Sequence, residues 1–195
     1  MSSVANVRLW LFDLKDTRLD SYEPLLDASE RELGKRMRFG LRFQRCRGAV
    51  RVVLGRELSR APEQLVFAYG PNGKPELPGI EFNVSHSGDL AVLATSFDAP
   101  LGVDVEEVRS NMDWQELAQR FLKQEARTPE EFFELWTARE AYLKGTGEGI
   151  GGGLSSPMAN GWRIVPLAVP ATYRGALAVR AEEIRVNVCS LVQTE

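Results

Sequence analysis

The stretch that decides the fold is Gly102-Val103-Asp104-Val105-Glu106, the centre of an eight-residue segment, LGVDVEEV, over residues 101–108. Apolar and acidic residues alternate in it as they do along a β-strand. We therefore expect Val103 and Val105 to face a core, and Asp104 and Glu106 to face together the other way. Two like charges so placed repel unless something neutralises them, and a hard divalent cation with oxygen ligands would do so. A strand face exposed to solvent is the alternative, and spacing alone leaves both open.

The order of elements before this strand is repeated from this strand onward. Each of the two series has a strand, then helices, then further strands. In addition, residues 32–37 (ELGKRM) weakly resemble residues 116–121 (ELAQRF). We expect an α+β fold of two similar α/β halves, residues 1–100 and 101–195, related by a pseudo-twofold axis. The helices are expected from a capping box at Ser29 and Glu32, and over 43–58, 113–122 and 128–144. The strands are expected at 7–14, 65–69, 81–84, 90–96, 101–108, 162–169, 173–180 and 184–191.

Composition narrows the functional classes. The 195 residues are 44% hydrophobic and carry a formal net charge of -3, which is ordinary for a globular chain and disfavours a general nucleic-acid binder. Cys46 and Cys189 lie far apart and match no metal-binding spacing, which suits free thiols in a reducing cytosol. No signal peptide or membrane-spanning run is evident, so a cytoplasmic protein without membrane contact is expected, and two internal halves favour a monomer.

The segment 136–144, WTAREAYLK, lies in a helix whose start is marked by Thr128 and Pro129. Glu140 and Lys144 are four residues apart, so they stack at the edge of its apolar stripe. An exposed ion pair is the alternative interpretation. Arg139 falls inside the apolar arc, where it needs a partner or must extend to solvent.

Residues 82–88, FNVSHSG, form a strand that ends in a turn and contain His86, the single histidine of the chain. The hydroxyls of Ser85 and Ser87 and the imidazole could donate hydrogen bonds to an anion. A structural histidine is the alternative. The absence of a second histidine or cysteine nearby argues against zinc, and the G-x-S-x-G elbow of many hydrolases is absent.

A basic stretch and a lysine turn complete the candidate set. Between residues 31 and 51 the sequence has one acid, Glu32, and eight basic residues: Arg31, Lys35, Arg36, Arg38, Arg42, Arg45, Arg47 and Arg51. Arginine suits phosphate, although a solvated helical face is an equal alternative. Lys74 stands in a turn, Gly73-Lys74-Pro75. The segment 147–152 matches G-x-G-x-x-G, but it follows a helix rather than a strand, which excludes a dinucleotide-binding turn.

Taken in order, GKP at 73–75, FNVSHS at 82–87, GVDVE at 102–106 and WTAREAYLK at 136–144 resemble the phosphopantetheinyl transferases of the surfactin-synthetase-activating (Sfp) type. The resemblance runs from about residue 35 to 149. It implies two α+β halves with the active site between them, and transfer of phosphopantetheine from coenzyme A to a serine of an apo acyl or peptidyl carrier protein.

The resemblance also implies roles for matched positions. Asp104, Glu106 and Glu140 look like the acids that bind Mg²⁺. Glu140 and Lys144 look catalytic, Glu140 as the candidate base and Lys144 beside the diphosphate. The coenzyme A contacts implied are Lys74, Ser85, His86, Lys144 and, on a looser match, Lys35 and Arg47.

Some positions depart from the family pattern. Arg139 stands where lysine is usual, Gln44 where an acid is common, and the span from Arg120 to Glu130, where carrier contacts are expected, is short. Two alternatives therefore stay open: another Mg²⁺-dependent transferase with a nucleotide-linked donor, and a non-catalytic homologue that binds coenzyme A or a carrier. The sequence does not select among fatty-acid, polyketide and nonribosomal-peptide carriers, or between Mg²⁺ and Mn²⁺.

Overall fold

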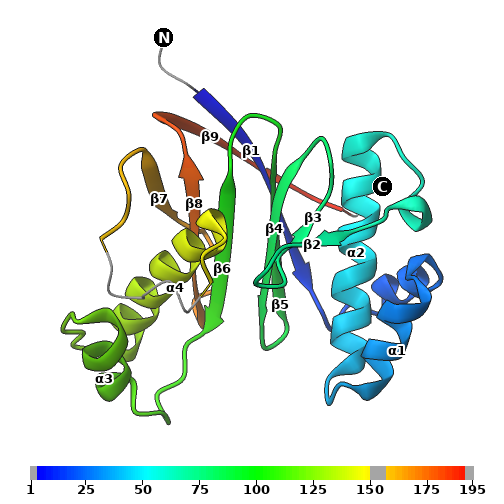
Figure 1. Cartoon of the computed structure of the whole chain (residues 1–195). Coiled ribbons are helices and arrows are strands. Elements are labelled where there is room, and N and C mark those ends of the chain that lie inside the picture. Colours follow the sequence, from blue (N-terminus) through cyan, green and yellow to red (C-terminus); the bar gives the residue numbers. More distant parts are fainter. Residues whose placement is uncertain (1–3, 150–156, 192–195) are drawn as a thin grey trace.

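A computed structural model describes residues 4–149 and 157–191 of the chain. It has a mixed α+β fold, as the sequence predicts (Figure 1). The glycine run at 151–153 lies outside the described residues. The part that the structure describes contains no helix long and apolar enough to cross a bilayer.

The first hundred residues contribute three strands, β1, β4 and β5, to a four-stranded sheet, with helices on its outer side. The elements are β1 (Val4–Asp13), the 3-10 segment η1 (Thr17–Leu25), α1 (Ala28–Arg36), α2 (Gly40–Leu58), η2 (Pro62–Gln64), β2 (Ala68–Tyr69), β3 (Pro75–Glu76), β4 (Glu81–Ser87) and β5 (Leu90–Ser96). Figure 1 shows α1 and α2 together on one side of the molecule. The strand expected over 65–69 is reduced to β2, since residues 65–67 belong to no regular element.

The remaining residues form a second sheet covered by a long helix. They contribute β6 (Leu101–Glu107), α3 (Trp114–Leu117), a π-helical turn η3 (Ala118–Leu122), α4 (Pro129–Thr146), β7 (Trp162–Pro166), β8 (Tyr173–Arg180) and β9 (Glu183–Cys189). The helix expected over 113–122 is thus interrupted after Leu117 and ends at Lys123, which adopts the left-handed conformation (φ 52°).

The two sheets share a strand order. The first sheet is ordered β4-β5-β1-β9 and the second β6-β8-β7, so β7-β8-β6 repeats β4-β5-β1 with the same antiparallel pairings. β9 pairs in parallel with β1, so the end of the chain completes the first sheet. The division at residue 100 and a twofold axis relating the halves stay predictions; the repeated order is the observation that supports them.

Strand alternation distributes β1 between two cores. Val7 and Leu9 pack in a cluster with Val103 and Val105 of β6, whereas Trp10 and Phe12 pack beneath α2. The predicted facing of Val103 and Val105 is therefore confirmed. The first cluster joins the two sheets, and it fixes β6 beside β4 in the middle of the molecule.

Two glycines let α4 approach β6 closely. A Cβ atom on Gly102 would lie 2.1 Å from the carbonyl oxygen of Ala141 and 2.3 Å from the backbone nitrogen of Gly145. A Cβ atom on Gly145 would lie 2.6 Å from the ring of Trp162. Since neither position has room for a side chain, the backbone of α4 rests directly on β6, and its inner face carries Glu140 and Lys144 towards Asp104.

One helix start differs from its prediction. The capping box of α1 uses Asp27 and Glu30 instead of Ser29 and Glu32: Asp27 Oδ1 accepts from the Glu30 backbone (2.9 Å), and Glu30 Oε2 accepts from the Asp27 backbone (3.0 Å). Glu30 also pairs with two arginines of α2, so tertiary contacts favour this register. The start of α4 is confirmed, with Thr128 as N-cap and Pro129 at the first position.

Candidate active site

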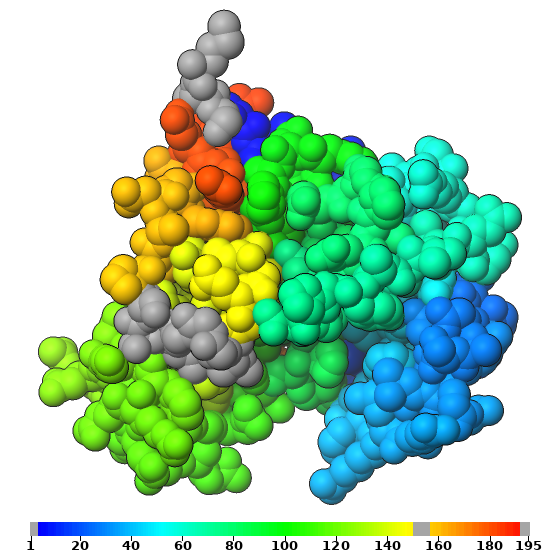
Figure 2. Space-filling view, in the orientation of Figure 1, coloured from blue at the N-terminus to red at the C-terminus, as the bar shows by residue number. Residues whose placement is uncertain are grey.

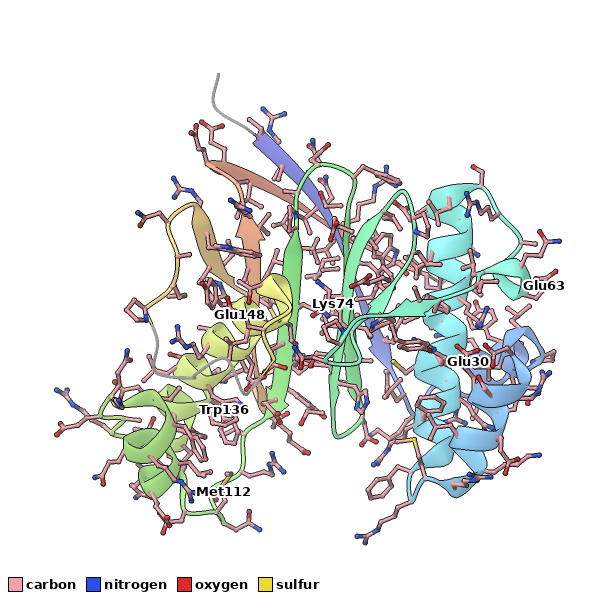
Figure 3. The ribbon with its side chains drawn as sticks, viewed as in Figure 1. Glu30, Glu63, Lys74, Met112, Trp136 and Glu148 are labelled. Atoms are coloured by element: carbon pink, nitrogen blue, oxygen red, sulfur yellow. The ribbon has the colours of Figure 1, made fainter. Side chains whose placement is uncertain are left out.

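The candidate site lies where β4, β6 and α4 meet, between the two sheets. β4 contributes Ser85 and His86, β6 contributes Asp104 and Glu106, and α4 contributes Glu140 and Lys144. Figure 3 shows Lys74 in the middle of the molecule, and it also labels Glu148, which follows the end of α4 at Thr146. In Figure 2 the surface is hollowed between α3 and the α1–α2 segment.

Asp104, Ser85 and Lys144 form a closed set of hydrogen bonds. Lys144 Nζ lies 2.6 Å from Asp104 Oδ1 and 3.0 Å from Ser85 Oγ, and Ser85 Oγ donates to Asp104 Oδ1 at 2.8 Å. The predicted proximity of these three residues is therefore present, although they come from three different elements. Lys144 makes its ion pair with Asp104 rather than with Glu140, four residues before it.

Glu106 and Glu140 are the other two acids. Glu106 Oε2 accepts from Ser87 Oγ at 2.7 Å and from Arg109 Nη2 at 3.3 Å. Burial raises the pKa of Glu106, and the neighbouring charge of Asp104 raises it further. Burial also raises the pKa of Glu140, with additional repulsion from Asp104 and Glu106, while Lys144 opposes the shift. The three carboxylates thus share one electrostatic environment.

The donor chemistry fits a hard divalent cation. Two buried oxygens, Asp104 Oδ2 and Glu140 Oε1, have no hydrogen-bond partner. Carboxylate oxygens are the ligands that Mg²⁺ prefers. Within residues 4–149 and 157–191, no group of three or more Asp, Glu, His or Cys side chains is already arranged to hold a metal ion. Two observations therefore support a cation here: the two oxygens without a partner, and the repulsion among the three carboxylates.

His86 and Lys74 line two different pockets, and among the described residues none of the three acids lines either of them. His86 lines a pocket of about 520 Å³ together with Arg38, Arg42 and Arg109, and burial lowers its pKa, with a further lowering by Lys144. Lys74 lines a pocket of about 400 Å³ and donates to the carbonyl of Leu101 at 3.3 Å, at the start of β6. Burial lowers the pKa of Lys74 as well.

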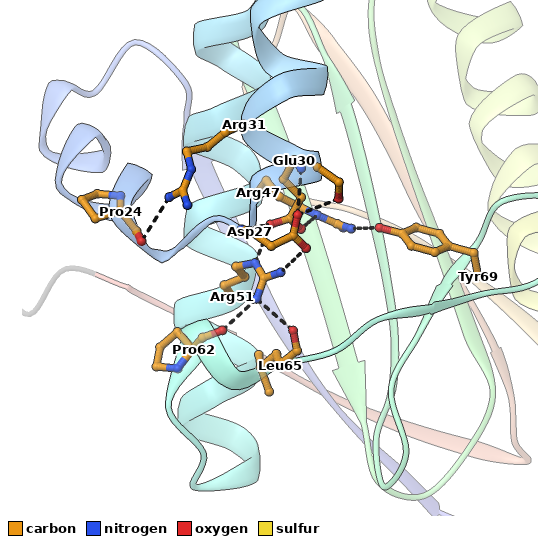
Figure 4. Close-up of polar contacts among 10 residues, drawn as sticks. Pro24, Asp27, Glu30, Arg31, Arg47, Arg51, Pro62, Leu65 and Tyr69 are labelled. Carbon is orange, nitrogen blue, oxygen red and sulfur yellow. Dashed lines mark hydrogen bonds and ion pairs between the residues drawn. The ribbon is translucent and has the colours of Figure 1, made fainter.

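Lys35 and Arg47 make their ion pairs elsewhere. Lys35 lies on α1 with 71% of its side chain exposed and faces Glu32 at 4.0 Å. Arg47 donates to Glu30 and to the hydroxyl of Tyr69 (Figure 4). The structure therefore does not bring these two residues to the acids, and their coenzyme A contacts stay predictions.

Three of the eight residues of the basic stretch, Arg45, Arg47 and Arg51, form an internal ion-pair network. Arg51 is 1% exposed and donates to Glu30, Asp27 and the carbonyls of Pro62 and Leu65 (Figure 4). Arg45 pairs with Asp20 and with the carbonyl of Leu14. Arg45 and Arg51 are buried and already paired with acids. They therefore form neither a solvated helical face nor a free phosphate site.

Two side chains of β4 make contacts with the β6 backbone that the sequence did not predict: Asn83, which was given no role, and Ser87, which was considered only as a donor to an anion. Asn83 Oδ1 accepts from the Val103 backbone at 2.8 Å, and Ser87 Oγ accepts from the Glu107 backbone at 3.1 Å. The only signal in the sequence is that small polar residues recur at every second position, 83, 85 and 87. A further hydrogen bond that the sequence did not predict runs from Asn72 Nδ2 to the carbonyl of Gly147, at the end of α4 (2.7 Å).

Comparisons with known proteins agree with this geometry. A model of the 4'-phosphopantetheinyl transferase superfamily matches residues 100–190, which include β6 and α4. The protein slr0495 of Synechocystis sp. is 38% identical over 167 residues, which cover 76% of this chain and 68% of that protein. The 4'-phosphopantetheinyl transferase HetI of Nostoc sp. is 36% identical over 74% of this chain and 70% of its own length. The 4'-phosphopantetheinyl transferase psf-1 of Bacillus pumilus is 34% identical over 77% and 71%.

The α+β fold, the acids on β6 and α4, and these relatives define a transferase enzyme. The chain belongs to the 4'-phosphopantetheinyl transferase superfamily.

Proposed function

We propose that this enzyme is of the surfactin-synthetase-activating type and transfers phosphopantetheine from coenzyme A to a serine of an apo carrier protein with the aid of Mg²⁺. The order of the four motifs supports the subtype, as does the similarity to psf-1. Asp104, Glu106 and Glu140 would hold the metal. Bound Mg²⁺ would neutralise the diphosphate of coenzyme A and so favour attack on phosphorus.

The proposed reaction needs one proton acceptor and one group that stabilises the leaving group. The carrier serine oxygen attacks the phosphorus that bears pantetheine, and the bond from that phosphorus to the bridging oxygen breaks. Adenosine 3',5'-bisphosphate leaves. Glu140 Oε1 takes the serine proton, directly or through water, and Lys144 Nζ stabilises the departing phosphate oxygen or protonates it.

One observation carries the proposal. Three acids from β6 and α4 share one buried environment beside Lys144, and two of their oxygens, Asp104 Oδ2 and Glu140 Oε1, have no partner. Unsatisfied buried carboxylate oxygens are unfavourable, and a protein keeps them where a ligand satisfies them. Lys74, Ser85 and His86 are the coenzyme A contacts that the proposal retains nearest to these acids.

The test follows the small molecules. The enzyme is incubated with coenzyme A and Mg²⁺, with and without apo carrier protein, and the nucleotides are separated by chromatography. The proposal expects coenzyme A to be consumed and adenosine 3',5'-bisphosphate to be released in proportion to the carrier added. Release that is independent of a carrier would indicate hydrolysis instead, and an unchanged coenzyme A pool with every carrier class would contradict the proposal.

A further inference from the structure

The contact between β4 and β6 is made by side chains instead of a backbone ladder. β4 and β6 are the edge strands of two different sheets. Every second backbone N–H of β6 donates across the junction to a β4 side chain: Val103 to Asn83 Oδ1 (2.8 Å), Val105 to Ser85 Oγ (3.3 Å) and Glu107 to Ser87 Oγ (3.1 Å). The spacing of twenty residues is the same in each pair, so the register is regular.

The two serines have a second task that the asparagine lacks. A hydroxyl can donate one hydrogen bond while it accepts others. Ser85 Oγ donates to Asp104 Oδ1 at 2.8 Å, and Ser87 Oγ donates to Glu106 Oε2 at 2.7 Å. Each serine therefore holds the β6 backbone at one residue and the carboxylate of the residue before it.

Glu106 has a competing partner on the outer side. Arg109 Nη2 lies 3.3 Å from the same oxygen, Oε2, and its side chain is 52% exposed. Asp104, in contrast, is held by both Ser85 and Lys144. Without the Ser87 hydroxyl, the partner left to Glu106 among these contacts is the half-exposed Arg109, and the carboxylate would turn towards it.

We propose that Ser87 is a positioning residue, which aims the Glu106 carboxylate into the site across the junction between the two sheets. This inference rests on the proposed function, because it takes Glu106 as a metal ligand. Residues that orient a metal ligand by hydrogen bonding commonly change metal affinity ten- to a hundredfold when they are replaced, roughly the range in which this effect is expected.

The experiment measures Mn²⁺ binding by the enzyme without coenzyme A, from the electron paramagnetic resonance signal of free Mn²⁺. Ser87→Ala should bind Mn²⁺ about tenfold more weakly than wild type. Ser87→Thr keeps the hydroxyl and should restore affinity to within about twofold, on the same physical ground. Thermal unfolding is recorded for each variant, since a variant that merely loosens the fold would show a lower melting temperature with unchanged affinity.

Asn83→Ala is the matched control, because it removes a junction bond that touches no carboxylate. It should lower the melting temperature and weaken Mn²⁺ binding less than Ser87→Ala does. Equal weakening by both variants would overturn the positioning role, since general docking of β6 would then explain it.

Glu106→Ala separates this inference from the proposed function. Wild-type affinity in Ser87→Ala, beside weakened binding in Glu106→Ala, overturns the role of Ser87 and leaves the proposed function standing. Wild-type affinity in Glu106→Ala overturns the metal assignment itself, and the inference about Ser87 with it.

Discussion

Lys144 Nζ lies 2.6 Å from Asp104 Oδ1, although the two residues are forty positions apart and belong to α4 and β6. The side chain of Asp104 is 4% exposed and that of Lys144 is 30% exposed. One cation of the chain therefore already offsets one of the three acids. Glu106 has only the half-exposed Arg109 as a cationic partner, so a divalent cation would balance the charge that remains on Glu106 and Glu140.

Lys144→Met should destabilise the enzyme and make it more responsive to Mg²⁺. Without Lys144, Asp104 is left as a buried charge without its cation, and about 2 kcal/mol of unfolding free energy should be lost. Added Mg²⁺ should restore more stability to this variant than it gives to wild type, as measured by thermal unfolding. Lys15→Met, which removes an exposed pair with Asp89, is the control and should leave stability almost unchanged. Equal effects of the two substitutions would contradict the account.

Glu140→Gln should abolish transfer and stabilise the metal-free fold at neutral pH. Burial raises the pKa of Glu140 in the folded state above the ordinary value of 4.5, so its charged form opposes folding. This unfavourable contribution is absent below the ordinary pKa, grows as pH rises through it, and is complete above the raised pKa. The variant should therefore be more stable than wild type near pH 7, and the gain should shrink in acid. Urea unfolding at both pH values, with chelator present, measures this, and a loss of stability at neutral pH would oppose it.

The pH dependence of transfer should reflect the same two acids. Glu106 and Glu140 act in their charged forms, and both have a raised pKa. Activity should therefore fall, as the pH is lowered, with a midpoint above the ordinary carboxylate value of 4.5. Saturating Mg²⁺ should move this midpoint to lower pH, because a cation favours the charged forms. A midpoint that does not respond to Mg²⁺ would argue against carboxylate ligation.

Glu30→Ala should unfold the enzyme far more easily than its position outside the site suggests. Arg51 is 1% exposed and loses its buried partner in this variant (Figure 4). Breaking a buried pair by removing one partner is strongly destabilising, by about 3–5 kcal/mol. Glu32→Ala, on the exposed side of the same helix, should change stability by less than about 0.5 kcal/mol. Urea denaturation of both variants decides, and a small effect of Glu30→Ala would mean that Arg51 finds other partners.

Local sequence patterns predicted the features that depend on neighbours in the chain. Alternation along β6 predicted that Val103 and Val105 face a core, and Thr128 with Pro129 predicted the start of α4. The same reasoning placed the start of α1 at Ser29, because Asp27 with Glu30 and Ser29 with Glu32 offer two overlapping capping patterns there. Only the ion pairs of Glu30 with α2 distinguish between them.

Long-range features had no local signal. The parallel pairing of β9 with β1 joins the two ends of the chain, and no periodicity in either strand encodes its partner. The bond from Ser85 to Asp104 likewise depends on how two sheets meet at their edges. The basic residues of α2 were open to two interpretations for a related reason: the acids that pair with Arg45 and Arg51 are contributed by η1, α1 and the residue before α1.

The central claim is the transfer of phosphopantetheine by the Asp104 site, and intact-protein mass spectrometry of apo carrier proteins tests it most directly. Carriers of the fatty-acid, polyketide and nonribosomal-peptide types are each incubated with the enzyme, coenzyme A and Mg²⁺. The account predicts that at least one carrier gains the mass of one phosphopantetheine, and that the gain is lost with chelator and with Asp104→Ala. A carrier modified equally well with chelator, or by Asp104→Ala, would contradict the role of the acids. No mass gain on any carrier, despite coenzyme A binding, would contradict the transfer itself.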